Sequence, residues 1–387
     1  MNEERTTWDA LVVGAGYIGC SVAYHLALAG LRTALLEKGH IGSGASRANY
    51  GNIQVQDAEL DYSLPMTVAG WRCWQTLEEE LGGHLGLRRV GSLLVAETTQ
   101  QWDALSARLL KLHAAGIRAE MLPADRFAEI EPLLDPRSAV GACYHPDEAR
   151  IWPFRLMHAY AERGMERGLA LHRETEVTGF RVRGGRLEGV TTNRGDLSAG
   201  LVVLATGAWT PALGRLLGRE WRAPHVHGQA LVTEASPLRL SNFLSSAAFF
   251  DSMRESTDGQ PPTAVMAIGQ SGNGNFLLGE AGVITEDLGA RATAAGLAAI
   301  ARESLRFIPA LRHLRAIRGW ASPVAFTDDG LPFLGPVADL PGLILATAFK
   351  STVIVTPLVG RLVAQLALGR RPEIDIRPFS PDRVIVH

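Results

Sequence analysis

The most constraining feature of this sequence is a glycine-rich turn that directly follows a short apolar run. Residues 10–13, ALVV, have the pattern of a parallel strand that is buried on both faces. The next six residues, GAGYIG at 14–19, fit the pattern GxGxxG. In this pattern the first glycine makes the turn, the second admits a pyrophosphate, and the third lets the helix approach the strand. The sequence therefore predicts a Rossmann-type dinucleotide site near the N-terminus.

The residues after the turn supply the other parts of such a site. Apolar residues recur every four positions over 18–26, up to Gly30, which predicts a helix with one apolar stripe. A second strand over 33–37 ends at Glu37, 23 residues after Gly14. In dinucleotide sites, an acid about 20 residues beyond the first glycine binds the ribose hydroxyls. Because a carboxylate repels a 2′-phosphate, Glu37 favours an unmodified ribose.

NAD and FAD share this motif, and three later segments favour FAD. The small residues of GSGASRAN (42–49) suit a loop that lines phosphate or flavin. LATGAW (204–209) ends a buried strand with a glycine, where the backbone passes near a large group. DGLPFLGP (329–336) precedes an apolar strand at 343–347 and a helix at 357–368. These segments predict a nucleotide-binding domain built from both ends of the chain.

The remaining segments predict a second domain. Apolar residues have helical spacing through much of 60–112, and a glycine turn joins the two arms of a hairpin over 177–191. Strand-like stretches at 230–233 and 276–279 precede an alanine-rich helix at 292–307. The expected fold class is therefore α/β (α+β, two-domain), in which a Rossmann-type FAD-binding domain of discontinuous segments (1–60, 145–220 and 325–387) adjoins a substrate domain with a largely antiparallel sheet (61–144 and 221–324).

Composition and charge exclude several classes of partner. The net charge of −2 offers no basic surplus for nucleic acid. The three cysteines are far apart and form no CxxC pair, and the polar residues 1–8 lack the apolar run of a secretory signal. Lys350 interrupts the apolar stretch 342–360, which argues against a transmembrane segment. We expect a cytoplasmic protein that binds small molecules and reaches a membrane only through a partner subunit.

As an ordered set, these segments resemble the D-amino acid oxidase superfamily of FAD-dependent oxidoreductases, over nearly the whole chain. Further likeness comes from EVT at 176–178 and from RGW at 318–320. Within the superfamily the chain looks like glycine and sarcosine oxidases, and SRANYGN (46–52) is most similar to the flavin (beta) subunits of opine and D-hydroxyproline dehydrogenases. The resemblance implies that FAD is bound by Gly14, Gly16, Tyr17, Ile18, Gly19, Glu37, Lys38, Gly44, Ala45, Ser46, Ala48, Asn49, Val177, Ala205, Thr206, Gly207, Trp209, Arg318, Lys350, Ser351 and Thr352.

The chain departs from the family pattern at three places. In glycine oxidase-like members, an arginine shortly after the family's tryptophan binds the substrate carboxylate. The residue at the corresponding position of this chain is Val324. Sarcosine oxidases attach FAD to a cysteine where this chain has Ser322, so non-covalent FAD is expected. Many relatives carry Gly-His-Gly or His-Ser before the final helix, where this chain reads AFKST (348–352). The carboxylate must therefore be bound by another segment.

Four residues are candidates for catalysis. Lys350 lies between two apolar stretches, so we expect it to stabilise reduced flavin or to bind substrate; the alternative is a lysine that extends into solvent at a helix start. Arg47 and Tyr50 follow the phosphate loop and suit a carboxylate clamp and a phenol donor, although a surface ion pair is the alternative for Arg47. His227 shares a strand face with His225, but no third ligand is visible. We assign His227 to substrate contact or structure and expect no metal.

The resemblance implies an enzyme that transfers a hydride from a C–N carbon to FAD. The expected substrates are a D-amino acid, a secondary amino acid of the D-hydroxyproline or sarcosine type, or an opine. Two alternatives stay open. In the first, the chain is a flavin-binding subunit of a hetero-oligomer and is inactive without the other dehydrogenase subunits. In the second, it is an NAD-dependent dehydrogenase. Arg254, in the polar loop 251–262, is a further candidate for substrate contact.

Overall fold

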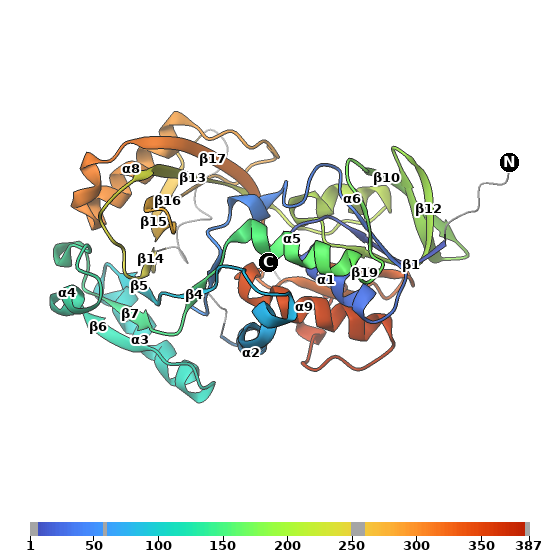
Figure 1. The fold of residues 1–387 in the computed structure, drawn as a ribbon, viewed down its shortest axis with the longest axis horizontal. Helices are drawn as coiled ribbons and strands as arrows, with labels where there is room; N and C mark the ends of the chain where they lie inside the picture. Colours follow the sequence, from blue (N-terminus) through green and yellow to red (C-terminus); the bar gives the residue numbers. More distant parts are fainter. Residues whose placement is uncertain (1–6, 57–59, 249–259, 384–387) are drawn as a thin grey trace.

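The computed structural model describes residues 7–56, 60–248 and 260–383, so Arg254 lies outside the described residues. Two large β-sheets form the two ends of the molecule, and helices lie beneath and between them (Figure 1). The predicted α/β fold with a dinucleotide-binding sheet and a second, mainly antiparallel sheet is confirmed. The exact domain limits stay a prediction.

The first sheet has a parallel centre, as the turn motif predicts. The neighbouring pairs β1/β12, β1/β2, β2/β9 and β12/β19 all run parallel. Their spatial order is β19 (Leu343–Thr347), β12 (Gly195–Leu204), β1 (Thr7–Val13), β2 (Thr33–Leu36) and β9 (Ala170–His172). The predicted hairpin is confirmed as the antiparallel pair β10 (Val177–Arg183) and β11 (Arg186–Thr192), and β18 (Phe333–Pro336) pairs with β19. The C-terminal strand thus completes a sheet that begins at the N-terminus.

Helix α1 (Tyr17–Leu28) differs from the expected helix with one apolar stripe, because its residues from Tyr17 to Ala27 are all buried. The reason is that three layers surround it. The sheet covers one side, and α5 (Pro153–Met165) and α9 (Thr352–Ala367) pack against the others. Periodicity alone does not reveal this, since a helix that is covered all round needs apolar or small residues on every side.

Helix α9 begins at Thr352, five residues earlier than the predicted start at Pro357. The proline lies inside the helix, where it removes the N–H bond to the carbonyl of Val353. Helix α2 (Leu64–Glu80) packs against this part of α9, and the indole of Trp74 donates to the carbonyl oxygen of Ile354 at 3.1 Å. Residues 64–80, which we assigned to the substrate domain, therefore contact a helix of the nucleotide-binding end.

The second sheet contains eight strands of the described chain, and only the pair β5/β14 is parallel. In order these are β17 (Ala316–Ala325), β13 (His225–Ala235), β16 (Asn275–Gly282), β15 (Thr263–Gln270), β14 (Phe243–Ser246), β5 (Ser92–Ala96), β7 (Gly141–His145) and β6 (Glu120–Pro123). Strand β5 interrupts the stretch expected to be mostly helical. The helix α8 (Ala294–Phe307), predicted over 292–307, packs against β13, β15 and β16.

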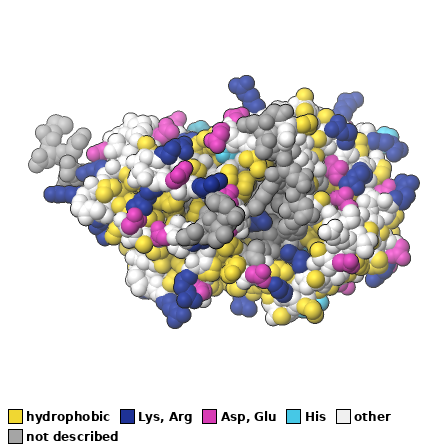
Figure 2. All heavy atoms as spheres, turned by 180° about the vertical axis from the view of Figure 1, so that it is seen from behind, with side chains coloured by type: hydrophobic (Ala, Val, Ile, Leu, Met, Phe, Trp, Pro, Cys, Tyr) yellow, Lys and Arg dark blue, Asp and Glu magenta, His cyan; other side chains and the backbone are white. Residues whose placement is uncertain are grey.

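The remaining elements are short or peripheral. They are α3 (Thr99–Ala114), α4 (Phe127–Ile130), α6 (Thr210–Leu216), and the small sheet of β3 (Asn52–Ile53), β8 (Ala149–Arg150) and β4 (Arg88–Arg89). Seen from behind, basic, acidic and apolar side chains of the described residues are interspersed, without a broad area of one charge sign (Figure 2). In the described part of the chain, no helix has the length and apolar character needed to cross a membrane.

We predict that Gly70→Ala destabilises the fold by about 1–3 kcal/mol, because a Cβ there would lie 2.5 Å from the backbone carbonyl oxygen of Ile354 and force α2 away from α9. Thermal unfolding of the purified protein measures the change. Gly200→Ala is the control, since its Cβ would meet only the Asp9 carbonyl oxygen at 3.5 Å. Equal melting temperatures for both variants would contradict the predicted close contact.

We also predict that acid destabilises the protein partly through His25. This side chain is buried, and burial lowers its pKa to about 4. The positive charge of Arg361 also lowers this pKa, whereas the hydrogen bond to the carbonyl of Ser21 raises it. Glu80, 4.0 Å away, is the facing carboxylate. The unfolded chain takes up the proton near pH 6.5 and the folded chain only near pH 4, so stability falls as pH falls through this window.

At pH 5 the loss attributable to His25 is about 2 kcal/mol relative to pH 8. Urea unfolding of wild type and His25→Gln at both pH values measures it. The variant should lose less stability between pH 8 and pH 5 than the wild type does. Parallel pH profiles for the two proteins would contradict the assignment.

Candidate functional site

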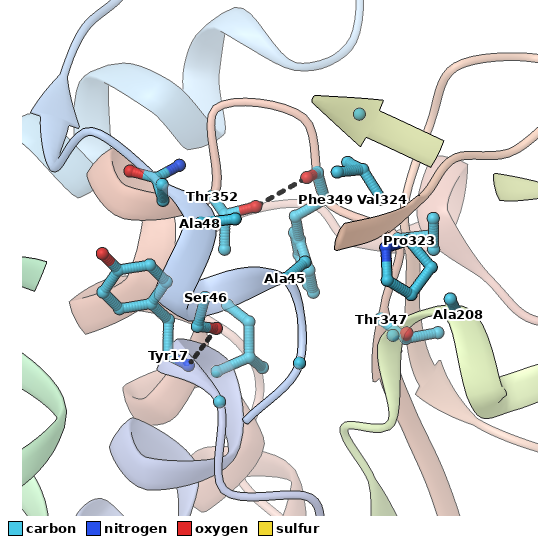
Figure 3. Close-up of a pocket in the computed structure, with 18 of the residues that line it drawn as sticks. Tyr17, Ala45, Ser46, Ala48, Ala208, Pro323, Val324, Thr347, Phe349 and Thr352 are labelled. Carbon is cyan, nitrogen blue, oxygen red and sulfur yellow. Dashed lines mark hydrogen bonds between the residues drawn. The ribbon is translucent and has the colours of Figure 1, made fainter. Parts of the chain in front are cut away.

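A cavity of about 880 Å³ takes its walls from both sheets. Its size is within the range of small-molecule and cofactor sites. One half is lined by the turn after β1, the end of β2, and the residues after β12 and β19; the other half is lined by β13, β14, β15 and β17. In Figure 3, Tyr17 and Ser46 lie on one side of the cavity, and Pro323 and Val324 lie across from them. The dinucleotide motif and the second sheet therefore share one cavity.

The three glycines of the motif allow backbones to approach closely. Gly14 has a φ of +100°, and a Cβ there would lie 2.6 Å from the carbonyl oxygen of Ala205. A Cβ on Gly19 would lie 1.7 Å from the carbonyl oxygen of Gly14. Gly16 lines the cavity and leaves the start of α1 open toward it, where backbone N–H groups favour a phosphate. Gly19 itself lies behind the wall, so its role is to bring helix and strand together.

Glu37 is fixed at the cavity wall by two backbone N–H groups. Its Oε2 accepts from Ala15 at 2.9 Å and its Oε1 accepts from Gly39 at 2.8 Å. The side chain is buried and lines the cavity. A buried carboxylate held in this way keeps lone pairs for further donors, which suits the two hydroxyls of a ribose.

Next to Glu37, the cavity wall carries a lysine ammonium group and an aromatic ring. The ammonium nitrogen of Lys38 lies 4.0 Å from the ring centroid of Trp209, and Val177 lies on the same part of the wall. Burial lowers the pKa of Lys38, and the nearby carboxylates of Glu176 and Glu37 oppose that shift. This end of the cavity provides the apolar and polar surfaces that an adenine requires.

The small-residue loop and the start of α1 are joined directly. The hydroxyl of Ser46 accepts from the backbone N–H of Tyr17 at 3.1 Å (Figure 3). The short 3-10 helix Ala45–Ala48 is tied to the second sheet, because the indole of Trp320 donates to the carbonyl oxygen of Ala48 at 3.3 Å. The loop therefore spans the middle of the cavity between the two sheets.

The DGLP segment supports the cavity through a partly exposed ion pair. Asp329 pairs with Arg383 at 2.7 Å and accepts from the N–H of Leu331 at 3.0 Å. Burial raises the pKa of Asp329, but these partners outweigh it and hold that pKa below its ordinary value. Gly330, with a φ of +74°, turns the chain. Both Asp329 and Gly330 line the cavity, so this carboxylate braces the wall.

The segment between β19 and α9 presents a helix N-terminus to the cavity. Ala348 and Ser351 both have a left-handed backbone, with φ of +60° and +46°, which is unfavourable for side chains other than glycine. Ser351 gives α9 no side-chain cap, and Thr352 instead donates its hydroxyl to the carbonyl of Phe349 at 2.7 Å (Figure 3). The first N–H groups of α9 are thus available to an electron-rich group.

Lys350 lies in this segment and lines the cavity, but its side chain is exposed. The expectation of an ammonium enclosed between apolar stretches is therefore wrong, because β19 ends before Lys350 and α9 begins after it. Two of the chain's three lysines, Lys38 and Lys350, line the cavity. No arginine is among the described residues that line it.

Three other candidates lie away from the cavity wall. Arg47 and Arg318 are exposed, although neighbours of Arg47 line the cavity. His227 is buried, but its neighbours Val226 and Gly228 face the cavity, so the alternation along β13 turns His227 away from it. In the described part of the chain, no cluster of three metal-ligating side chains is present.

The other predicted residues lie together on the wall. These are Gly14, Gly16, Tyr17, Ile18, Glu37, Lys38, Gly44, Ala45, Ser46, Ala48, Asn49, Tyr50, Val177, Ala205, Thr206, Gly207, Trp209, Lys350, Ser351 and Thr352. The sequence prediction missed Gln54, Gln56, Ser245 and Glu280, which line the end nearest the second sheet. No motif marks them: Ser245 and Glu280 lie on strands β14 and β16, and Gln54 and Gln56 follow β3, so only the fold brings the four residues to one cavity.

The residues present fit FAD. The close backbone approach at Gly14, the open start of α1 at Gly16 and the fixed carboxylate of Glu37 match what a dinucleotide needs. None of the chain's cysteines is among the lining residues, and Ser322 carries no thiol. This chemistry is compatible with a non-covalently bound cofactor.

We predict that Glu37→Ala raises the dissociation constant for FAD roughly 10- to 100-fold, because a charged acceptor for the ribose hydroxyls is lost. Fluorescence titration of the cofactor-free protein measures the constant, and its melting temperature shows whether the fold persists. Glu188→Ala, an exposed carboxylate on β11 of the same sheet, is the control. Unchanged FAD affinity in Glu37→Ala would refute the assigned contact.

Comparison with known proteins agrees with this geometry. A model of the DAO family, described as FAD dependent oxidoreductase, matches residues 9–366. Glycine oxidase of Geobacillus kaustophilus is 28% identical over 98% of this chain and 97% of its own, and glycine oxidase of Pseudomonas aeruginosa is 30% identical over 96% and 98%. Hydrogen cyanide synthase subunit HcnC of P. aeruginosa is 26% identical over 97% and 96%.

The fold agrees as well. The crystal structure of glycine oxidase from G. kaustophilus superposes with a TM-score of 0.88, at 26% identity, over 98% of this chain and 100% of that one. The expected superfamily and the expected cofactor are thus confirmed, and the alternative of an NAD-dependent dehydrogenase is wrong. The chain belongs to the DAO family of FAD-dependent oxidoreductases.

Proposed function

We propose that this protein oxidises the C–N bond of a small amino acid or amine. The candidate substrates are a D-amino acid, a secondary amino acid of the D-hydroxyproline or sarcosine type, or an opine. The names of two relatives, both glycine oxidases, support an amino acid as substrate. The observation that carries the proposal is the continuity of the cavity, which leads from the Glu37 end to polar side chains on the second sheet.

Bound FAD supplies the redox chemistry, since it accepts a hydride from the carbon that bears the amine, which becomes an imine that water hydrolyses. The protein must hold that carbon in place and balance charge. The N-terminus of α9 faces the middle of the cavity, so its positive end favours negative charge there. Tyr50 places a buried hydroxyl in the half that faces the second sheet.

The substrate carboxylate needs a cation other than the arginine of glycine oxidase-like members. Val324 lines the cavity at that register. Among the described lining residues the cations are Lys38 and Lys350, and Lys38 lies over Trp209 at the Glu37 end. We therefore propose that Lys350 binds the substrate carboxylate or stabilises the negative charge of the reduced cofactor.

The experiment that tests the proposal is an anaerobic visible spectrum of the purified protein. It is recorded before and after addition of D-amino acids, N-methyl amino acids and opines. A yellow protein that one compound bleaches supports the proposal and names the substrate. A yellow protein that no amine or amino acid bleaches would overturn it.

We predict that Lys350→Met lowers the rate of flavin reduction by substrate at least about tenfold, because a charge beside the reacting groups is lost. Stopped-flow absorbance under anaerobic conditions measures this rate. Lys111→Met is the control, since Lys111 lies on α3, outside the cavity lining, and pairs with Asp61. Equal rates for Lys350→Met and wild type would show that Lys350 has no role in flavin reduction.

A second proposal concerns the electron acceptor. One relative, HcnC, is named as a subunit of hydrogen cyanide synthase. We propose that this chain also works with partner subunits and passes its electrons to one of them. A chain of this kind should be reduced by substrate yet react slowly with oxygen. Turnover of the isolated protein with an artificial dye, compared with oxygen, distinguishes the two cases.

A further inference from the structure

We propose that the end of the cavity at the second sheet is a polar alcove that selects substrates with an uncharged hydroxyl or carboxamide group remote from the amine. The alcove consists of Tyr50, Gln54, Gln56 and Ser245. This inference rests on the proposed function, which it narrows from small amino acids and amines to those with such a group.

Strand register fixes the floor of the alcove. Ser245 on β14 lies beside Ala267 on β15 and Leu94 on β5, and Ala267 in turn lies beside Gly279 on β16. The Tyr50 hydroxyl lies directly over Gly279, where a Cβ would come within 1.9 Å of it. Neighbouring strands are about 4.8 Å apart, so this hydroxyl and Ser245 are roughly two strands apart. The small residues between them leave room above the sheet.

Four polar atoms without hydrogen-bond partners belong to residues that line this end of the cavity. The Tyr50 hydroxyl, Gln54 Oε1, Gln56 Nε2 and Ser245 Oγ are all buried and make no hydrogen bond. All four residues line the cavity. The side chains of Gln56 and Ser245 are 1% and 9% exposed, so water does not satisfy them freely. Buried polar groups are almost always bonded, and four unbonded ones at one end of a cavity indicate a polar ligand.

Buried contacts behind the wall hold the alcove in place. Glu148 accepts from the backbone N–H of Gln56 at 3.0 Å and from the hydroxyl of Ser92. Arg108 donates to the carbonyl oxygen of Gln56 at 2.9 Å. The Ser92 hydroxyl also donates to Gln56 Oε1 at 3.4 Å, and the amide nitrogen of Gln56 makes no hydrogen bond. The side chain is therefore positioned before any substrate binds.

The polar and charged groups among the described residues at this end of the cavity disfavour an anion. Glu280 lines the same half of the cavity, and no arginine is among its described lining residues. A carboxylate in the alcove would meet this negative charge as well as the acceptor oxygen of Gln54. A hydroxyl or carboxamide both donates and accepts, so it can bond to Gln54 and Gln56 together. The second carboxylate of an opine fits this end poorly.

The test compares substrate pairs in which the hydroxyl of one member is replaced by a methyl group or a hydrogen atom in the other. Both enantiomers of serine and 2-aminobutyrate, of homoserine and 2-aminopentanoate, and of 4-hydroxyproline and proline are given to the FAD-loaded protein. Reduction kinetics and anaerobic calorimetric binding are both measured. For at least one pair we expect the hydroxylated member to be preferred at least about tenfold, in kcat/KM or in affinity.

Substitutions of the alcove residues test whether these side chains cause the preference for the hydroxylated member. Gln56→Leu and Ser245→Ala should each reduce it several-fold while the apolar member is still bound or oxidised. Ser304→Ala is the matched control, because its hydroxyl is also buried without a partner but lies on α8, outside the cavity lining. It should leave the preference unchanged.

The outcomes separate the two proposals. If amines bleach the flavin but no hydroxylated member is preferred, the alcove is refuted and the proposed function stands. If no compound bleaches the flavin, the proposed function fails. The affinities measured by calorimetry for the same pairs then test the alcove by themselves. A preference that survives both Gln56→Leu and Ser245→Ala also overturns the inference.

Discussion

The close contact of three backbone segments at Gly14 is the constraint on which the rest of this structure depends. The turn after β1 lies against the start of α1 on one side and the end of β12 on the other, at distances that no Cβ permits. Because these segments touch, α1 lies flat against the sheet, and its remaining surface is covered by α5 and α9. The open start of α1 then faces the cavity.

The cavity divides its chemistry between the two sheets. The Glu37 end carries a fixed carboxylate, a cation over an aromatic ring and backbone donors, which together suit a dinucleotide. The far end carries neutral polar atoms, from Ser245 on the second sheet and from Tyr50, Gln54 and Gln56 beside β3. Between them, the strained segment from Ala348 to Ser351 turns the start of α9 inward. The cofactor half is thus specified by backbone geometry, and the substrate half by side chains that packing leaves unbonded.

Sequence patterns predicted the parts of this site that depend on local geometry. The turn at Gly14, the acid at Glu37 and the strand that ends near Thr206 all lie where their motifs place them. The patterns failed where a residue's surroundings come from distant segments. Arg47 follows the phosphate loop yet extends into solvent, and the alternation along β13 directs His227 away from the cavity. Proximity in sequence did not establish which way these side chains point.

The sequence by itself predicted a dinucleotide site at a strand–turn–helix unit, because the buried strand, the glycine spacing, the helix and the acid occur in the order that such a site requires. It also predicted β2, β12 and β19 of that sheet, but not β9. Only the tertiary structure decided the start of α9, the exposure of Lys350 and the polar alcove. Tyr50 and Gln56 flank β3, whereas Ser245 lies on β14 almost 200 residues later, and their meeting at one cavity leaves no periodic signal in the sequence.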